Sequence, residues 1–235
     1  MRPLNAIDSQ AELAAVPHCF RVEGRHSHFR YFALLDPEPA AALAALLPLL
    51  SCGEEAAAVG FDRLSQATAL DTSTRGTLCK IVDDERCHDA MLRGLQAALP
   101  RARLDTAVLN RARRFHLRLS RGGTVLHLAR IAGLDAAVCT ILSRLLRPGC
   151  PAARDDGVRS VLSHIRRDET SHVMVSRNIA LAAPDRKAVR DAAAEARDGL
   201  AGLLTYGADA FEVLDVDPDR LLRDIAHLPD GLLPR

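Results

Sequence analysis

The sequence predicts an all-α protein, and three observations support this prediction. Its most frequent residues, Ala, Leu and Arg, are good helix formers. Aromatic residues make up only 3% of the chain and Trp is absent, which fits poorly with a β-sandwich. Apolar residues recur with helical spacing along most of the chain. We expect a single domain over 1–235, with an N-terminal arm (1–36), a four-helix core (37–182) and additional C-terminal helices (183–235).

The charge and hydropathy of the chain limit its partners. A formal net charge of +1 gives no reason to expect a nucleic-acid or membrane-surface partner. No run approaches about 18 uninterrupted apolar residues, and the first ten residues lack the apolar core of a signal peptide. The six cysteines form no Cys-x-x-Cys pair, so disulfides are not required. We therefore expect a cytoplasmic protein that binds neither nucleic acid nor membrane.

The first expected helix holds two adjacent acids. The run Asp36-Pro-Glu-Pro predicts its start, because proline is tolerated in a first helical turn, and an Ala/Leu-rich stretch extends it to about Ala69. Glu54 lies on the apolar face of this helix, whereas Glu55 shares its face with polar residues. Periodicity therefore favours Glu54 as the inward acid. Ser51-x-x-Glu54 is also a capping box, in which Glu54 would only bind the Ser51 amide, and this alternative stays open.

The second expected helix carries polar residues on its apolar face. It starts at Asp71-Thr-Ser-Thr and runs to about Leu99. Glu85 and His88 interrupt an inward face that is otherwise apolar. A buried carboxylate and a buried imidazole are costly unless they are paired or bound to a metal. Their position therefore indicates a functional site.

A basic segment separates the second and third helices. Seven arginines lie between residues 101 and 121, and the segment ends at Gly122-Gly123. Its length fits a long crossover connection. We interpret the arginines as a solvated helix face, with a site for an anionic partner as the alternative.

The third expected helix contains a single acid. It runs from Thr124 to about Arg147, and Asp135 is its only acidic residue. Asp135 is centred on an apolar face, where a lone carboxylate is either a ligand or an uncompensated cost. We expect His127, which lies off this face, to be exposed or to lie at the edge of the bundle.

The fourth expected helix spans about 157–182. Its inward face places Glu169 and His172 among apolar residues. Two further amphipathic helices are expected over 184–214 and 218–227, and neither carries ligand spacing.

One motif occurs in both the second and the fourth helix. It reads Asp-Glu-x-x-His, at 84–88 and at 168–172. Glu and His at i and i+3 share one helix face, which is a metal-ligand spacing. The composition gives a chance expectation of about 0.03 for this pattern, so two copies indicate a metal site.

The candidate acids are level with one another in pairs. At 1.5 Å per residue, Glu54 and Glu85 lie roughly 21–23 Å from the turn between their helices. Asp135 and Glu169 each lie about 18 Å from their own turn. The helices can therefore bring all four carboxylates into one layer.

At this point the sequence resembles the ferritin-like di-iron carboxylate superfamily over roughly residues 50–180. The order carboxylate, Glu-x-x-His, carboxylate, Glu-x-x-His stands here as Glu54, Glu85 with His88, Asp135, and Glu169 with His172. The resemblance implies a four-helix bundle with one long crossover, in which these side chains hold two Fe ions, with Mn as the alternative.

The Asp before each Glu resembles the oxygenase and oxidase members of this superfamily. In those members it implies that Asp84 orients His172 and that Asp168 orients His88. Asp135 stands where Glu is usual, and its shorter side chain implies an open metal position.

The resemblance implies a non-haem di-iron, O₂-dependent oxidoreductase, an oxygenase or oxidase. It would act on a small-molecule substrate with an electron donor and could form a homodimer. The main alternative is a ferritin-like iron-binding or ferroxidase storage protein. We expect small and apolar side chains to line the substrate cavity: Ala57, Ala58, Phe61, Ala132 and Cys139. The substrate and the reaction stay open at this point.

Overall fold

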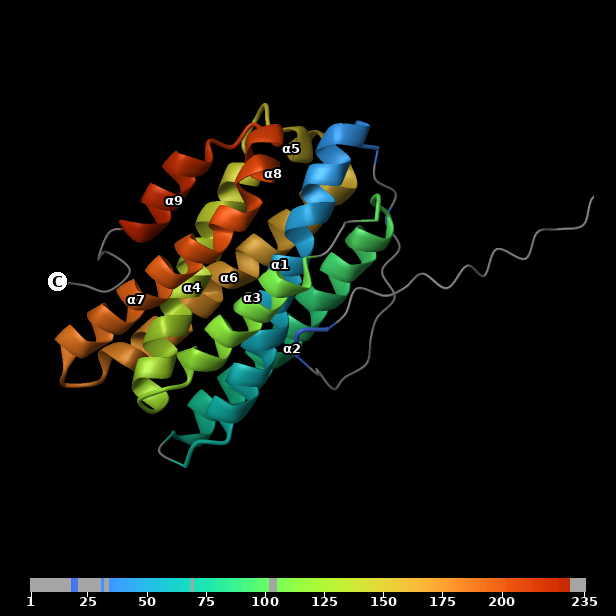
Figure 1. Cartoon of the computed structure of the whole chain (residues 1–235). Helices are drawn as coiled ribbons and strands as arrows, with labels where there is room; N and C mark the ends of the chain where they lie inside the picture. Colours follow the sequence, from blue (N-terminus) through green and yellow to red (C-terminus); the bar gives the residue numbers. More distant parts are fainter. Residues whose placement is uncertain (1–17, 21–30, 32–33, 69, 102–104, 229–235) are drawn as a thin grey trace, which may run out of the picture.

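The computed structural model describes residues 18–20, 31, 34–68, 70–101 and 105–228, and in this part of the chain it is helical without strands (Figure 1). The predicted all-α class is confirmed, whereas most of the expected N-terminal arm lies outside the described residues. The helices are α1 (Pro37–Ser65), α2 (Thr72–Ala97), α3 (Thr106–Leu119), α4 (Thr124–Leu145), α5 (Pro151–Arg154), α6 (Asp156–Leu181), α7 (Arg186–Leu204), α8 (Ala208–Val213) and α9 (Pro218–Ala226), with a 3-10 turn at Thr205–Gly207.

Aspartates precede three of the four long helices, α1, α2 and α6, whereas Gly123 precedes α4. Asp36 precedes two prolines in the first turns of α1. Asp71 accepts a hydrogen bond of 2.9 Å from the Thr74 amide at the start of α2, and Asp155 accepts one of 2.8 Å from the Val158 amide in α6. Helix α1 continues without a break through Ser51, so no helix begins there and the capping-box interpretation of Ser51 and Glu54 is wrong.

Long helices pack side by side in two groups. Helix α1 lies along α2, and α4 lies along both α6 and α7, as Figure 1 shows. Helix α2 also contacts α6, which joins the groups. The basic segment forms α3, which lies against α1 and α7. Helices α3 and α7 are therefore added to the four long helices that carry the candidate ligands.

The apolar core is divided into two clusters. One contains Leu47, Leu95 and Leu142, and the other contains Phe61 and Leu78, each with neighbours from several helices. On α1, α2 and α6 the candidate ligands lie between residues of one cluster and residues of the other. On α4, Asp135 directly follows Leu134, the first residue of that helix in the first cluster. A polar layer therefore crosses the bundle between two apolar layers.

Two helices are long and apolar enough to cross a membrane by length and composition alone, namely α1 and α4. In the most apolar window of each, 61% and 67% of the residues are buried inside the protein. Core helices of a bundle pass the same test, so this finding is weak evidence for a membrane span.

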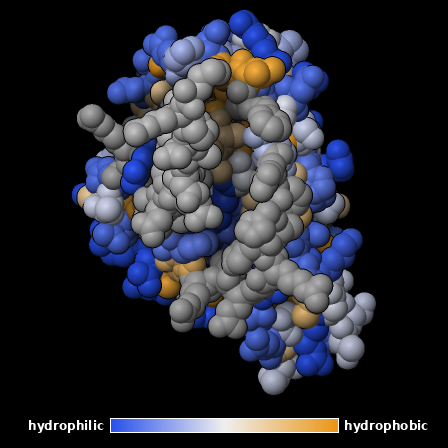
Figure 2. Space-filling model, turned by 90° about the vertical axis from the view of Figure 1, so that its right-hand side faces the viewer, coloured by the Kyte–Doolittle hydropathy of each residue, from blue (hydrophilic) through white to orange (hydrophobic). Residues whose placement is uncertain are grey.

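The surface on one side of the molecule is mostly hydrophilic. Figure 2 shows polar residues over most of the described part of this face, with scattered apolar residues. Over the whole described chain, the large apolar side chains that are exposed belong to Leu34, Leu117, Met174 and Tyr206.

A glycine allows α4 to approach α7 closely. A Cβ added to Gly133 would lie 2.7 Å from the Ala193 carbonyl oxygen and 3.2 Å from its carbonyl carbon. These are backbone atoms, so the helices would have to separate. We expect Gly133→Ala to lower the free energy of unfolding by about 1–3 kcal/mol, measured by urea denaturation, because overpacking outweighs the gain in helix propensity.

The matched control is Gly76→Ala in α2. Gly76 is exposed, and nothing among the described residues lies within 4 Å of an added Cβ. This variant should gain up to about 1 kcal/mol from helix propensity alone. Equal stability of the two variants would contradict the close contact between α4 and α7.

Candidate metal centre

Four helices place ionisable side chains in one buried layer. Each of these side chains belongs to a residue that is at most 6% exposed. They are Glu54 from α1, Glu85 and His88 from α2, Asp135 from α4, and Glu169 and His172 from α6. All six predicted site residues therefore lie at the same level of the bundle.

The His88 ring turns its Nδ1 atom toward three carboxylates. Nδ1 lies 3.2 Å from Glu54 Oε2 and 3.4 Å from Glu169 Oε1. Its distance to Glu85 Oε2 is 3.7 Å. These contacts join side chains from α1, α2 and α6.

The His172 ring has the same orientation. Its Nδ1 atom lies 3.0 Å from Glu85 Oε1 and 3.6 Å from Glu169 Oε1. The centroids of the His172 and His88 rings are 5.8 Å apart. Glu85 and Glu169 thus each lie beside both imidazoles.

The opposite nitrogen of each ring faces an aspartate from the other motif. His88 Nε2 lies 3.2 Å from Asp168 Oδ2. His172 Nε2 lies 3.5 Å from Asp84 Oδ2. Both contacts implied by the resemblance are therefore present in the structure. When Nε2 donates its proton to the aspartate, the Nδ1 lone pair is left facing the carboxylates.

Several atoms in the layer have no hydrogen-bond partner among the described residues. They include both carboxylate oxygens of Glu85, Oδ2 of Asp135 and Nδ1 of His172. The Glu85 and His172 atoms are close, but their geometry does not satisfy a hydrogen bond. Buried polar atoms without partners are costly, so these atoms fit a site that binds a cation.

The electrostatics of the layer agree with a cation site. Burial raises the pKa values of Glu54 and Asp135 well above the usual range of carboxyl groups. Burial also acts to raise the pKa of Glu85, but the neighbouring His172 and His88 outweigh it and lower the value to about 2. The carboxylates beside His172 outweigh burial in turn and raise its pKa to about 11. Buried carboxylates this close together repel one another when they are ionised, and a bound cation would neutralise their charge.

One group in this layer could hold a metal ion by distance. A ligand atom from each of Glu54, Glu85, His88 and Glu169 lies within 4.8 Å of the others. Carboxylate oxygen and imidazole nitrogen suit several divalent metals, so the donors do not identify the metal. Asp135 is not in this group, although it lines the same cavity as its three acids.

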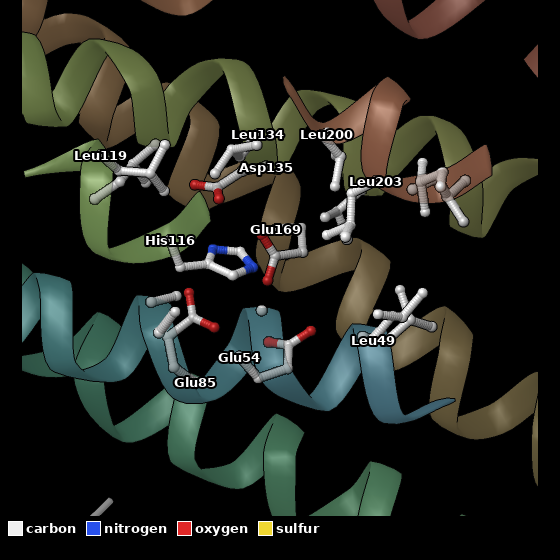
Figure 3. A pocket seen from close by; sticks show the side chains of 18 of the residues that line it. Leu49, Glu54, Glu85, His116, Leu119, Leu134, Asp135, Glu169, Leu200 and Leu203 are labelled. Carbon is white, nitrogen blue, oxygen red and sulfur yellow. The ribbon is translucent and has the colours of Figure 1, made fainter. Parts of the chain in front are cut away.

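An apolar cavity adjoins the layer. It has a volume of about 70 Å³. Its walls include Leu49, Leu134, Leu200 and Leu203, and Figure 3 shows Glu54, Glu85, Asp135 and Glu169 facing it from different helices. Helices α3 and α7 form part of its wall. Of the small residues expected along the cavity, Ala57 lines it. Ala58, Phe61 and Ala132 do not, and Cys139 borders a separate hollow beside Arg144.

Two histidines of this cavity were not anticipated. The sequence predicts that His127 is exposed or lies at the bundle edge, but it is buried beside Gly60. Burial, together with nearby Arg130, lowers its pKa to about 4. His116 comes from α3, and its ring points into the cavity in Figure 3. The signal for His116 is that it follows the buried Ala112 and Phe115 on the apolar face of α3.

Glu55 has a structural role away from the layer. The sequence placed it on a polar face, but it is fully buried. It accepts a hydrogen bond of 2.8 Å from the Phe20 amide, lies 2.6 Å from His18 Nδ1 and pairs with Arg93. Arg93 also binds Asp89 at 3.0 Å. Arg93 therefore pairs with both Glu55 and Asp89. Of the two adjacent glutamates of α1, Glu54 is the one that faces the imidazole of His88.

No family model matches the chain, and no curated protein matches its sequence. Its function must therefore be inferred from the geometry of the site.

The contacts of Asp84 and Asp168 predict a loss of metal affinity without loss of fold. An asparagine at either position accepts a weaker hydrogen bond from the imidazole, and its amide group can bind the ring in the wrong orientation. We expect Asp84→Asn and Asp168→Asn each to weaken metal binding by about 10–100-fold, measured by competition with a chelator, with unchanged helical circular dichroism. Asp83→Asn is the matched control, because Asp83 is exposed and pairs with Arg86. Parental affinity in both variants would show that these aspartates are only surface charges.

The buried His127 predicts acid sensitivity. Its pKa falls from 6.5 to about 4 on folding, so it stabilises the fold fully above pH 6.5 and this contribution is lost as the pH falls toward 4. The loss amounts to about 3 kcal/mol. In metal-free His127→Gln we expect a shallower fall in the free energy of unfolding between pH 7 and pH 4. His227→Gln, at an exposed position, should keep the parental slope. An unchanged slope in His127→Gln would mean that this ring does not titrate with folding.

Proposed function

We propose that the protein is a non-haem di-iron, O₂-dependent oxidoreductase, an oxygenase or oxidase, that acts on a small-molecule substrate. The observation that supports this most is the buried layer in which both Nδ1 atoms and the carboxylates of two Glu-x-x-His motifs face one another beside an apolar cavity. The proposed ligands are Glu54, Glu85, His88, Asp135, Glu169 and His172.

The residues fit two divalent cations in number and charge. Four carboxylates balance two Fe(II) ions, and each imidazole supplies one nitrogen donor. Manganese fits the same donors. When bound, two ferrous ions supply the electrons with which O₂ is first reduced, and an electron donor restores them.

The side chains around the ligands fix their orientation and exclude water. Asp84 and Asp168 orient the two rings through Nε2, the nitrogen opposite the Nδ1 atom that faces the carboxylates. The leucine walls of the cavity keep bulk water from the layer, which protects reactive species during oxidation.

The arrangement of helices supports a ferritin-like bundle. Helices α1 with α2 and α4 with α6 form the two packed pairs that carry the motifs, and α3 lies in the connection between them. We propose that this connection is the long crossover of that fold. The complete set of six residues lies in one chain, so a monomer or a homodimer is sufficient for the activity.

Iron storage is the alternative on the same ligands. The specific observation that favours an enzyme is the cavity beside the acidic layer, to which α3 and α7 contribute Leu119, Leu200 and Leu203. A mostly apolar space suits an organic substrate, whereas iron on its way to a store needs a polar path.

The test is metal content together with O₂ consumption and particle size. We expect the purified chain, loaded with Fe(II) without O₂, to bind two irons and then to consume O₂ with a reductant and substrate candidates. Glu85→Ala should lose iron and O₂ consumption, because Glu85 lies beside both imidazoles. Glu195→Ala, at an exposed glutamate, is the control and should match the parent.

Two results would overturn the proposal. One is a parent chain that binds no iron with the six residues intact. The other is a large closed shell that takes up iron far beyond two ions per chain, which would establish storage.

A further inference from the structure

The cavity beside the acidic layer is lined mainly by aliphatic side chains. Apart from the four acids, its described lining contains no charged side chain and no Phe, Tyr or Trp. Aliphatic residues make up most of the wall, and His116 and His127 are the remaining polar side chains. The cavity therefore offers a ligand aliphatic contacts and few hydrogen bonds.

The cavity also lacks net charge when the layer is filled. Burial lowers the pKa values of His116 and His127 to about 4, so both rings are neutral near pH 7. On the proposed function, two divalent cations balance the four carboxylates. A charged ligand would lose its hydration here without meeting a counterion, which is unfavourable.

The residues that line the cavity extend along α4. They run from His127 to Ile141, a span of about 21 Å along the helix. The cavity volume of about 70 Å³ is small for a lining of this extent. An unbranched chain can follow such a lining and contact more of it than a ring does.

The position of His116 suggests how such a ligand is oriented. In Figure 3 its ring points toward the region of Glu54, Glu85 and Glu169. The ring packs edge-on against Phe115 and Phe20, with centroids 5.0 and 6.4 Å away, and no hydrogen bond to it is found among the described residues. A neutral imidazole held in this way is free to bind one polar group of a ligand beside the metal ligands.

We infer that the cavity binds a neutral, unbranched aliphatic molecule with one hydrogen-bonding group, and that His116 binds this group. This inference deepens the proposed function, because it names the substrate class of the same site and relies on the metal ions for charge balance. His116 is thereby a specificity-determining residue contributed by the basic connection α3.

Binding of matched probes to the iron-loaded protein without O₂ tests the inference, because no turnover occurs. The probes are 1-hexanol, its charged equivalents hexanoate and hexylammonium, and the cyclic cyclohexanol, each followed by calorimetry. We expect 1-hexanol to bind at least about tenfold more tightly than the other three probes. His116→Leu should weaken 1-hexanol binding about tenfold through loss of the hydrogen bond, and His227→Leu should not.

A glycine in the cavity wall provides a second variant. Gly53 lines the cavity, and nothing among the described residues lies within 4 Å of an added Cβ. Gly53→Leu should therefore fill the cavity and abolish 1-hexanol binding while it strengthens α1. Gly76→Leu in α2 is the matched control, because it gives the same gain in helix propensity at an exposed position and should bind 1-hexanol like the parent.

Three outcomes would overturn the inference: equal or tighter binding of a charged or cyclic probe, no binding of 1-hexanol, or full binding by Gly53→Leu. Iron content is measured on the same samples. Two irons per chain without 1-hexanol binding would overturn the substrate class and leave the proposed function standing. Absence of iron would overturn the proposed function itself.

Discussion

The burial of six ionisable side chains in one layer is the constraint on which the rest of the structure depends. Carboxylates and imidazoles that lose their hydration destabilise a fold unless they are paired or neutralised. Here the pairs cross between helix groups, because Asp168 of α6 binds His88 of α2 while Asp84 of α2 binds His172 of α6. Each group alone would leave buried charges without partners. The polar layer therefore determines how the two groups align along the bundle.

Much of this layer could be predicted from the sequence, because its members interrupt apolar stripes. Glu85, His88 and Asp135 are polar residues at positions where helical periodicity demands burial. Repetition of the motif at Glu169 and His172 adds a second, independent signal. Periodicity encodes such positions locally, so they can be found without knowledge of how the helices pack.

The remaining features depend on contacts between distant segments. The burial of Glu55 requires Arg93 and the backbone of Phe20, and neither is related to it by helical spacing. His127 is buried by packing beside Gly60 on another helix. His116 reaches the cavity because α3 packs against α1 and α7. Its sequence contains many arginines, so the apolar face of α3 is difficult to recognise from the sequence. In all three cases the position of the residue depends on partners outside its own helix.

The two halves of the layer are related by the repeated motif but are not equal. On one half, Glu54 reaches His88 Nδ1 at 3.2 Å. On the other, the shorter Asp135 makes no ion pair with an imidazole among the described residues, and its Oδ2 atom lacks a hydrogen-bond partner. Asp135 also lies on α4 midway along the cavity wall, between His127 and Ile141. The shorter acid thus leaves space on the side where an aliphatic ligand would lie. On the proposed function, we expect an open metal position beside Asp135, because its shorter side chain reaches less far into the layer than the side chain of Glu54.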